Sequence, residues 1–219
     1  MNDLKWNRWG AATGYLAVAL GLTAASFERG APPANAPVEQ SLAYFIRYRT
    51  ELLAQSLLFV LSAGVLLWFI GCLRGFLQKA EQGSGRLSSV AFGAGILWAG
   101  LQFVLQGAQV ALAMGANPEL PATLAGMMGD LTYAFSVIAY VPMGIMLLAV
   151  AVVTWRFKAF PAWLGWLSAA GAAVNLLMSA GIVAGGLLVP GGALTYVLYL
   201  LQAVWQVAVP TVMIARAKA

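Results

Sequence analysis

The chain has 219 residues, of which 62% are hydrophobic and only 9% charged, and its formal net charge is +5. Together with a mean hydropathy of +0.84, this composition is typical of a membrane protein and leaves almost nothing for a soluble domain. The single cysteine, Cys72, and the lack of histidine exclude an internal disulfide, His-ligated haem, Cys/His zinc sites and His-based triads. We therefore expect no metal and no cofactor.

Six apolar stretches are each long enough to cross roughly 30 Å of hydrocarbon at about 1.5 Å per residue. In chain order they cover 10–27, 52–73, 87–115, 131–155, 162–189 and 193–215. The stretches are continuously apolar and do not alternate with period two, which argues against membrane strands. We expect an all-α polytopic protein, with one domain over 1–219 in which six helices form a compact antiparallel bundle.

The first stretch has the basic start and the small residues "TAAS" of a signal peptide, but we expect it to be retained as a helix. The segment 28–50 after it contains "APPANAP" and is predicted as an extended external linker.

Basic residues are distributed unevenly between the two sides of the predicted bundle. One side collects Lys5, Arg8, Arg74, Lys79, Arg86, Arg156, Lys158, Arg216 and Lys218, and the other only Arg29, Arg47 and Arg49. Cytoplasmic loops carry the excess of Lys and Arg, so both termini are predicted to be cytoplasmic. The positive charge then indicates topology, and nucleic acid is not expected as a partner.

Small residues recur four apart in three of the spans: Gly10 and Gly14; Gly107, Ala111 and Gly115; and Gly181 and Gly185. Such residues let helices approach closely. Packing within the chain is favoured over dimerisation, because six helices already supply partners.

Polar residues share faces of the predicted helices when each residue is taken as about 100° of rotation. The third span carries Gln102, Gln106 and Gln109 on one face, and the second carries Glu51, Gln55 and Ser62. The others contribute Asp130, Tyr133 and Tyr140; Ser168, Asn175 and Ser179; and Thr195, Tyr199, Gln202 and Gln206. These groups should point inward, either bonding one another between helices or lining an outward-open polar cavity.

The stretch "YFIRYRTELL" places three charges where the second span begins. Arg47 and Glu51 are four residues apart and are expected to pair along a helix surface. The simpler interpretation is an interfacial ion pair. The other places these groups with Asp130 around a cavity mouth, where they could attract an anionic headgroup or exchange protons with a ligand.

Three motifs, "R-x-R-x-E-L-L", "LLWFIGCLR" and "FPAWLGWLSAAGAAVNLL", resemble a group of bacterial, often actinobacterial, small integral membrane proteins whose domain is of unknown function. The resemblance implies six helices in a bacterial inner membrane. It implies no activity and no catalytic residue.

The polar faces predict a protein that binds or transports a small amphipathic or lipid-like ligand, with the lipid bilayer as its surroundings. The residues expected at the ligand are Arg47, Arg49, Glu51, Gln55, Gln102, Gln106, Gln109, Asp130, Tyr133, Asn175, Tyr199, Gln202 and Gln206. One alternative is an intramembrane enzyme that uses Glu51 and Asp130 as acid and base on an isoprenoid or other lipid. A further alternative is an accessory protein that pairs with another membrane protein.

Overall fold

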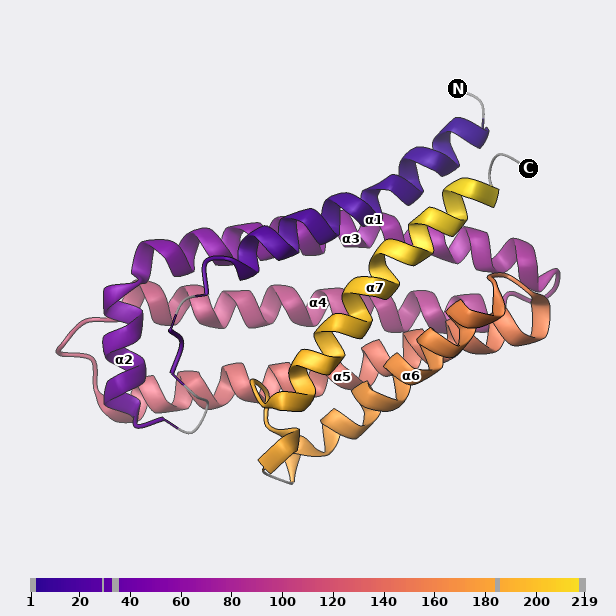
Figure 1. Ribbon diagram of the computed structural model, residues 1–219. Coiled ribbons are helices and arrows are strands. Elements are labelled where there is room, and N and C mark those ends of the chain that lie inside the picture. Colours follow the sequence, from indigo (N-terminus) through magenta and orange to yellow (C-terminus); the bar gives the residue numbers. More distant parts are fainter. Residues whose placement is uncertain (1–2, 29, 33–35, 184–185, 217–219) are drawn as a thin grey trace.

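The computed structural model describes residues 3–28, 30–32, 36–183 and 186–216, and within these ranges every regular element is a helix (Figure 1). The elements are α1 (Asp3–Ala25), α2 (Val38–Arg47), α3 (Arg49–Glu81), α4 (Arg86–Gly115), α5 (Ala122–Phe157), α6 (Ala162–Met178), η1 (Ser179–Ile182), η2 (Gly186–Leu188) and α7 (Ala193–Arg216). The predicted all-α class is confirmed. The predictions that concern Arg29, Gly185, Lys218 and the centre of "APPANAP" fall outside the described residues.

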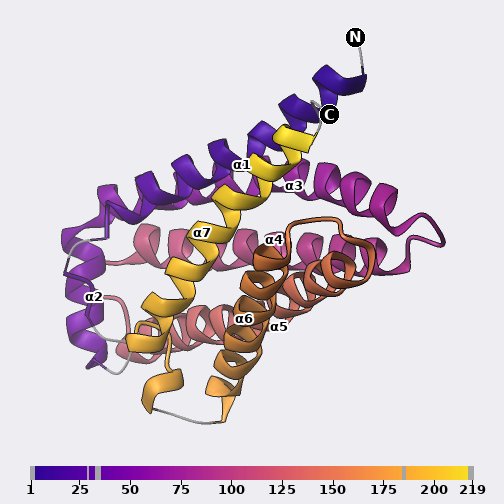
Figure 2. The same cartoon turned by 45° about the vertical axis from the view of Figure 1, so that its right-hand side comes forward.

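The long helices α3, α4 and α5 lie side by side as a layer with α4 in the middle (Figure 1). Helix α1 packs on α3, and α6 packs on α5. Helix α7 crosses this arrangement obliquely and contacts α1 and α6 (Figures 1 and 2). The start of α1 and the end of α7 lie close together, at the same end as the α3–α4 and α5–α6 connections.

Five described helices are long and apolar enough to cross a membrane: α3, α4, α5, α6 continued through η1, and α7. Helix α1 is not among them, since Asp3, Lys5 and Arg8 open it and Thr, Gly and Tyr residues follow. With 33 residues, α3 is about 50 Å long. It therefore exceeds the roughly 30 Å of hydrocarbon, and its ends can project into the interface.

The segment 28–50 is not a linker throughout, because it contains helix α2. Pro37 precedes this helix, and Tyr48 ends it with φ −108° and ψ 24°. Val38, Leu42 and Phe45 alternate with polar residues at helical spacing, which makes α2 strongly amphipathic without burying any of its residues. It lies across the ends of α3, α4 and α5, opposite the chain termini (Figures 1 and 2).

Two predicted boundaries also differ from the structure. Helix α5 begins at Ala122, nine residues before the predicted start at 131. The fifth span, predicted to continue to 189, ends as an α-helix at Met178 and tightens into the 3-10 turn η1. Glycine-rich sequence after Met178 weakens the α-helix there.

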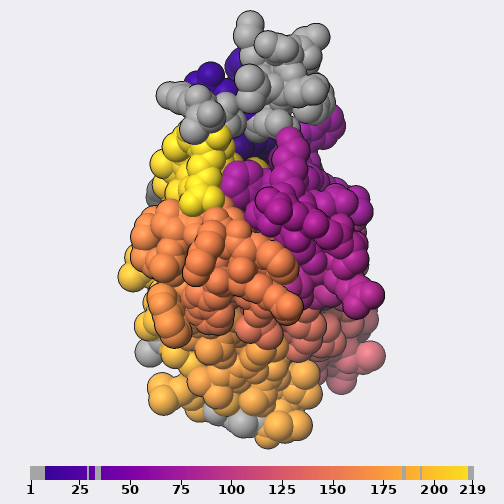
Figure 3. Space-filling view, turned by 90° about the vertical axis from the view of Figure 1, so that its right-hand side faces the viewer, coloured from indigo at the N-terminus to yellow at the C-terminus, as the bar shows by residue number. Residues whose placement is uncertain are grey.

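Two apolar clusters form the core, and the smaller, of Val137, Tyr140, Met178 and Leu198, lies toward the α2 end. The larger cluster fills the half of the bundle nearer the chain termini and includes Phe69 and Ile70 of α3, Met146 of α5, Leu164 of α6 and Trp205 of α7. In α4 this cluster contains no residue beyond Ala99. At that end, the α3–α4 and α5–α6 connections and the last turns of α7 form a continuous surface (Figure 3).

The small-residue stripes have different environments. Gly10 lies against Cys72, and a Cβ on Gly14 would come within 3.0 Å of the Phe69 ring, so the first stripe packs inside the chain as expected. The stripe on α4 does not, because a Cβ on Gly107 or Gly115 would meet nothing within 4 Å. That stripe therefore lies on the outer surface of the layer.

Glu81, at the end of α3, holds the start of α4. Its Oε1 accepts a hydrogen bond from the Leu87 N–H, and its Oε2 accepts one from the Ser88 N–H, each at 3.1 Å. A carboxylate at this position satisfies free amide groups and faces the positive end of the helix dipole.

Replacing Glu81 by alanine is expected to lower the free energy of unfolding by about 1–2 kcal/mol, the usual cost of losing a helix cap. Glu81→Gln retains one acceptor oxygen and should lose less. Chemical unfolding of the detergent-solubilised protein measures both, with Ser89→Ala on the exposed side of the same turn as the control. A loss of equal size in the Ser89 variant would contradict the capping role.

Candidate polar ligand site

The polar face predicted for α4 is the covered face of that helix. Gln106 is 5% exposed, and Gln102 and Gln109 are half-buried. On the opposite side of the helix, Val104 and Met114 are 47% and 60% exposed. The glutamines therefore point toward the interior of the protein and away from surrounding lipid.

A hydrogen-bond network joins α3 to α4 in the half of the bundle beyond the apolar core. Gln109 Nε2 donates to Gln55 Oε1 and to Ser56 Oγ, both at 3.0 Å. Gln55 is 4% exposed and Ser56 is fully buried. For these residues, bonding between helices is the observed arrangement.

A second set of polar contacts joins α6 to α7. Gln202 Nε2 donates to Asn175 Oδ1 at 3.4 Å, and the Asn175 amide donates back to the Gly171 carbonyl at 2.8 Å. One turn further along α7, Trp205 Nε1 donates to Ser168 Oγ at 2.8 Å. Two of the predicted polar stripes thus meet across one helix interface.

Tyr133 of α5 anchors the irregular segment after α6. Its hydroxyl donates to the Gly181 carbonyl at 3.0 Å. This bond satisfies a carbonyl where the α-helical pattern stops and fixes η1 against α5.

Gln106 is a buried polar residue that takes part in none of these hydrogen bonds. Its Oε1 is buried without a hydrogen-bond partner among the described residues. Gln102 and Gln206 likewise bond no other described residue, although both remain partly accessible. An unsatisfied buried acceptor costs about 1–3 kcal/mol, so a donor brought by water or by a ligand would be stabilised at this oxygen.

The charges of the "YFIRYRTELL" stretch do not form the expected ion pair between Arg47 and Glu51. Arg47 ends α2 and Glu51 lies in the first turn of α3, so the break at Tyr48 removes the helical spacing on which pairing depended. Neither residue has an ion pair with another described residue. Arg47 instead lies 5.3 Å from the Tyr48 ring centroid.

Arg49 caps the end of α4. Its Nη2 donates to the Met114 carbonyl at 2.8 Å, which satisfies one of the carbonyls left free by the last turn of the helix. The sequence offered no signal for this bond, because 65 residues separate the partners.

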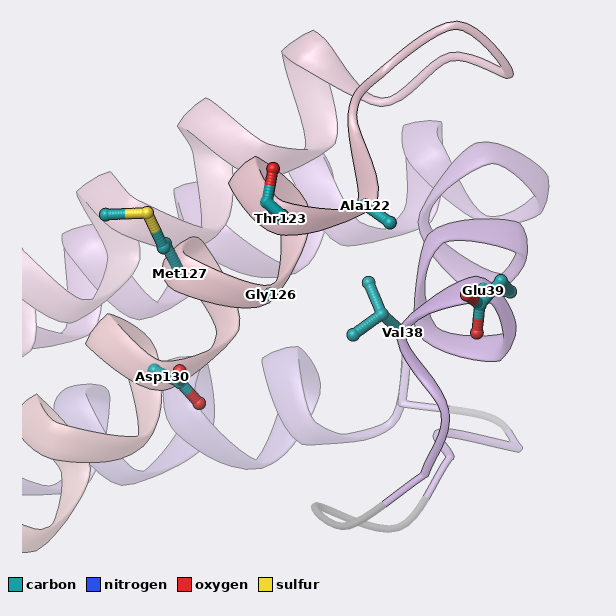
Figure 4. Close-up of a pocket in the computed structure, with 7 residues that line it drawn as sticks. All are labelled: Val38, Glu39, Ala122, Thr123, Gly126, Met127 and Asp130. Carbon is teal, nitrogen blue, oxygen red and sulfur yellow. The ribbon is translucent and has the colours of Figure 1, made fainter.

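Asp130 lines an open hollow of about 510 Å³ between α2 and the start of α5 (Figure 4). Glu39, which the sequence interpretation did not single out, lines it too, and Val38 lies between the two carboxylates. Glu51 and the predicted glutamines are not part of this lining. The hollow therefore combines Asp130 with Glu39 and not with Glu51.

Tyr199, which was expected at the ligand, is 57% exposed on α7. In α2, burial first, and then the charges of Glu28, Tyr48 and Glu51, raise the pKa of Tyr44 above its usual value. The Tyr44 phenol therefore stays protonated and can act as a donor.

The described part of the chain is all-helical, and its five long apolar helices are compatible with a multi-pass membrane protein. Comparison of the chain with family models, with curated proteins and with solved structures finds no match. The described residues contain no group of three or more Cys, Asp or Glu side chains placed to hold a metal ion.

Proposed function

We propose that this protein binds, and carries within the membrane, a small amphipathic or lipid-like ligand at the polar face of α4. The binding region is the half of the bundle between α2 and the apolar core. The observation that carries the proposal is Gln106 Oε1, a buried acceptor without a donor among the described residues, one turn from Gln109, which bonds Gln55 and Ser56.

An amphipathic ligand suits this region because it combines polar and apolar parts. Gln106 lies about 13 Å along α4 from the end of the helix, within reach of a headgroup that enters from the α2 end. Apolar side chains of the surrounding helices can contact an alkyl chain. A free polar solute would gain less from these surroundings.

In the proposed arrangement, α1 is the sixth span and both termini face the cytoplasm of a bacterium, with the protein in its inner membrane. Basic residues Arg74, Arg86, Arg156 and Arg216 occupy the end where the termini lie, which supports this orientation.

The test uses photoreactive hexadecanol in nanodiscs that contain the full-length protein. The expected result is labelling of peptides within 102–113, reduced about tenfold by Gln106→Leu, since one hydrogen bond to a buried acceptor is worth about 1–2 kcal/mol. Val104→Leu, on the exposed face of the same helix, is the matched control.

Because leucine removes an unsatisfied polar group, the Gln106 variant should remain as stable as the wild type in thermal unfolding. Labelling that is uniform over all lipid-facing peptides, or that persists unchanged in Gln106→Leu, would refute the proposed site.

A second candidate is association with another membrane protein through the outer face of α4. Gly107 and Gly115 have open space beside them, and Ala111 is exposed, so a partner helix could approach closely. Gly107→Leu should abolish such association, measured by cross-linking in native membranes. The acid–base alternative lacks a comparable observation, because Glu51 and Asp130 are both exposed and do not line one hollow.

A further inference from the structure

The charged residues at the α2 end of the molecule leave an excess of free negative charge. Five exposed acids lie in this part of the chain: Glu28, Glu39, Glu51, Glu119 and Asp130. None of them forms an ion pair with another described residue. A cation that approaches this end therefore meets carboxylates whose charge is not neutralised by a neighbour.

The two described arginines at this end are already engaged. Arg49 donates to the Met114 carbonyl, and Arg47 stacks over Tyr48. Both guanidinium groups keep their charge in these contacts, but the five exposed acids outnumber them, so an anionic headgroup would meet net repulsion at this end. Charge at the entrance thus favours a cation over an anion.

Gln106 sets a second requirement, and it does so independently of charge. Its buried Oε1 can only accept a hydrogen bond. An ionised sulfate, phosphate or carboxylate has no hydrogen to donate, and a quaternary ammonium has none either. A primary or secondary ammonium has both the positive charge and the N–H.

An aromatic side chain on the same face of α4 provides a third element of recognition. Trp98 is half-buried one turn before Gln102 and packs against the larger apolar cluster. Aromatic rings attract ammonium groups, more strongly when water is excluded.

We infer that the ligand is a long-chain primary or secondary ammonium, with its N–H directed to Gln106 Oε1. The inference rests on the proposed function and replaces the anionic headgroup that the sequence suggested. The inference specifies the chemistry of the ligand's polar headgroup. The ligand's alkyl chain would contact apolar side chains of the surrounding helices.

The experiment compares four probes of one chain length: dodecylammonium, dodecyltrimethylammonium, dodecanol and dodecyl sulfate. Each competes, below its micellar concentration, with photoreactive hexadecanol for the full-length protein in nanodiscs of zwitterionic lipid. Dodecylammonium is expected to compete about tenfold better than dodecyltrimethylammonium, which lacks the N–H, and than dodecanol, which lacks the charge. Dodecyl sulfate should be the weakest.

Two variants separate the contribution of the hydrogen bond to Gln106 from the contribution of the negative charge at the α2 end. Gln106→Leu should remove the difference between dodecylammonium and dodecyltrimethylammonium, while Glu28→Gln should weaken both cations and leave dodecanol unchanged. Competition by dodecyl sulfate equal to or better than that by dodecylammonium would overturn the inference and leave the proposed function intact. Absence of specific labelling by photoreactive hexadecanol would overturn both.

Discussion

Replacing Gly181 by alanine is expected to lower the free energy of unfolding by about 2–3 kcal/mol, near the upper end of the usual cost of overpacking. A Cβ at this position would come within 2.6 Å of the Leu188 carbonyl oxygen. That atom belongs to the backbone, so it cannot move aside by changing a rotamer. The Gly181 carbonyl also accepts the Tyr133 hydroxyl, so the displacement would weaken this bond as well.

Thermal and chemical unfolding of the solubilised protein measure the loss at Gly181. Gly107→Ala is the matched control, because a Cβ there meets nothing within 4 Å. Alanine favours helix over glycine by up to about 1 kcal/mol, so the control should be neutral or slightly more stable. Equal stability of the two variants would show that the segment after α6 relaxes freely.

The sequence predicts the long helices well, because each helix results from a continuous apolar run within its own segment. A continuous apolar run requires intrahelical hydrogen bonds wherever water is absent, and the start of α4 at Arg86 lies within one residue of its expected position. The sequence predicts α2 poorly, because this helix has only 10 residues and its alternating polar residues interrupt any apolar run long enough to indicate a membrane span. The sequence also misses the early end of α6, where the fold stabilises a 3-10 turn through Tyr133.

The direction of the polar residues was predictable, whereas their partners were not. Helical periodicity places Gln102, Gln106 and Gln109 on one face of α4, and the structure covers that face. Which glutamine finds a partner depends on the rotation and depth of α3 beside it. Gln109 reaches Gln55 on α3, while Gln106, one turn earlier on α4, reaches no described partner.

The division of the bundle into two halves links the fold to the proposed function. In the half near the termini, Phe69, Met146 and Trp205 belong to the larger apolar cluster, and this cluster holds α7 against the other helices. In the other half, polar contacts join α3 to α4 and α6 to α7 beside a smaller apolar cluster of Val137, Tyr140, Met178 and Leu198. Helices that the larger cluster holds together can position Gln106 while the α2 half admits the proposed ligand.

Trp205 is the residue that fixes α7 in this arrangement, and Trp205→Ala is expected to destabilise the protein by about 3–5 kcal/mol, as for other large-to-small core changes. The side chain is 2% exposed and bonds Ser168 Oγ at 2.8 Å.

Trp205→Phe keeps most of the packing and loses the hydrogen bond, so its cost should be about 1–2 kcal/mol. Ser168→Ala tests the same bond from the other side, and in the double variant the two losses should not add, because both remove one interaction. Trp163→Ala, at a position 54% exposed, is the control and should change stability by less than about 1 kcal/mol. Full additivity of the Trp205→Phe and Ser168→Ala losses would mean that the bond does not hold α6 and α7 together, and that shape complementarity alone positions α7.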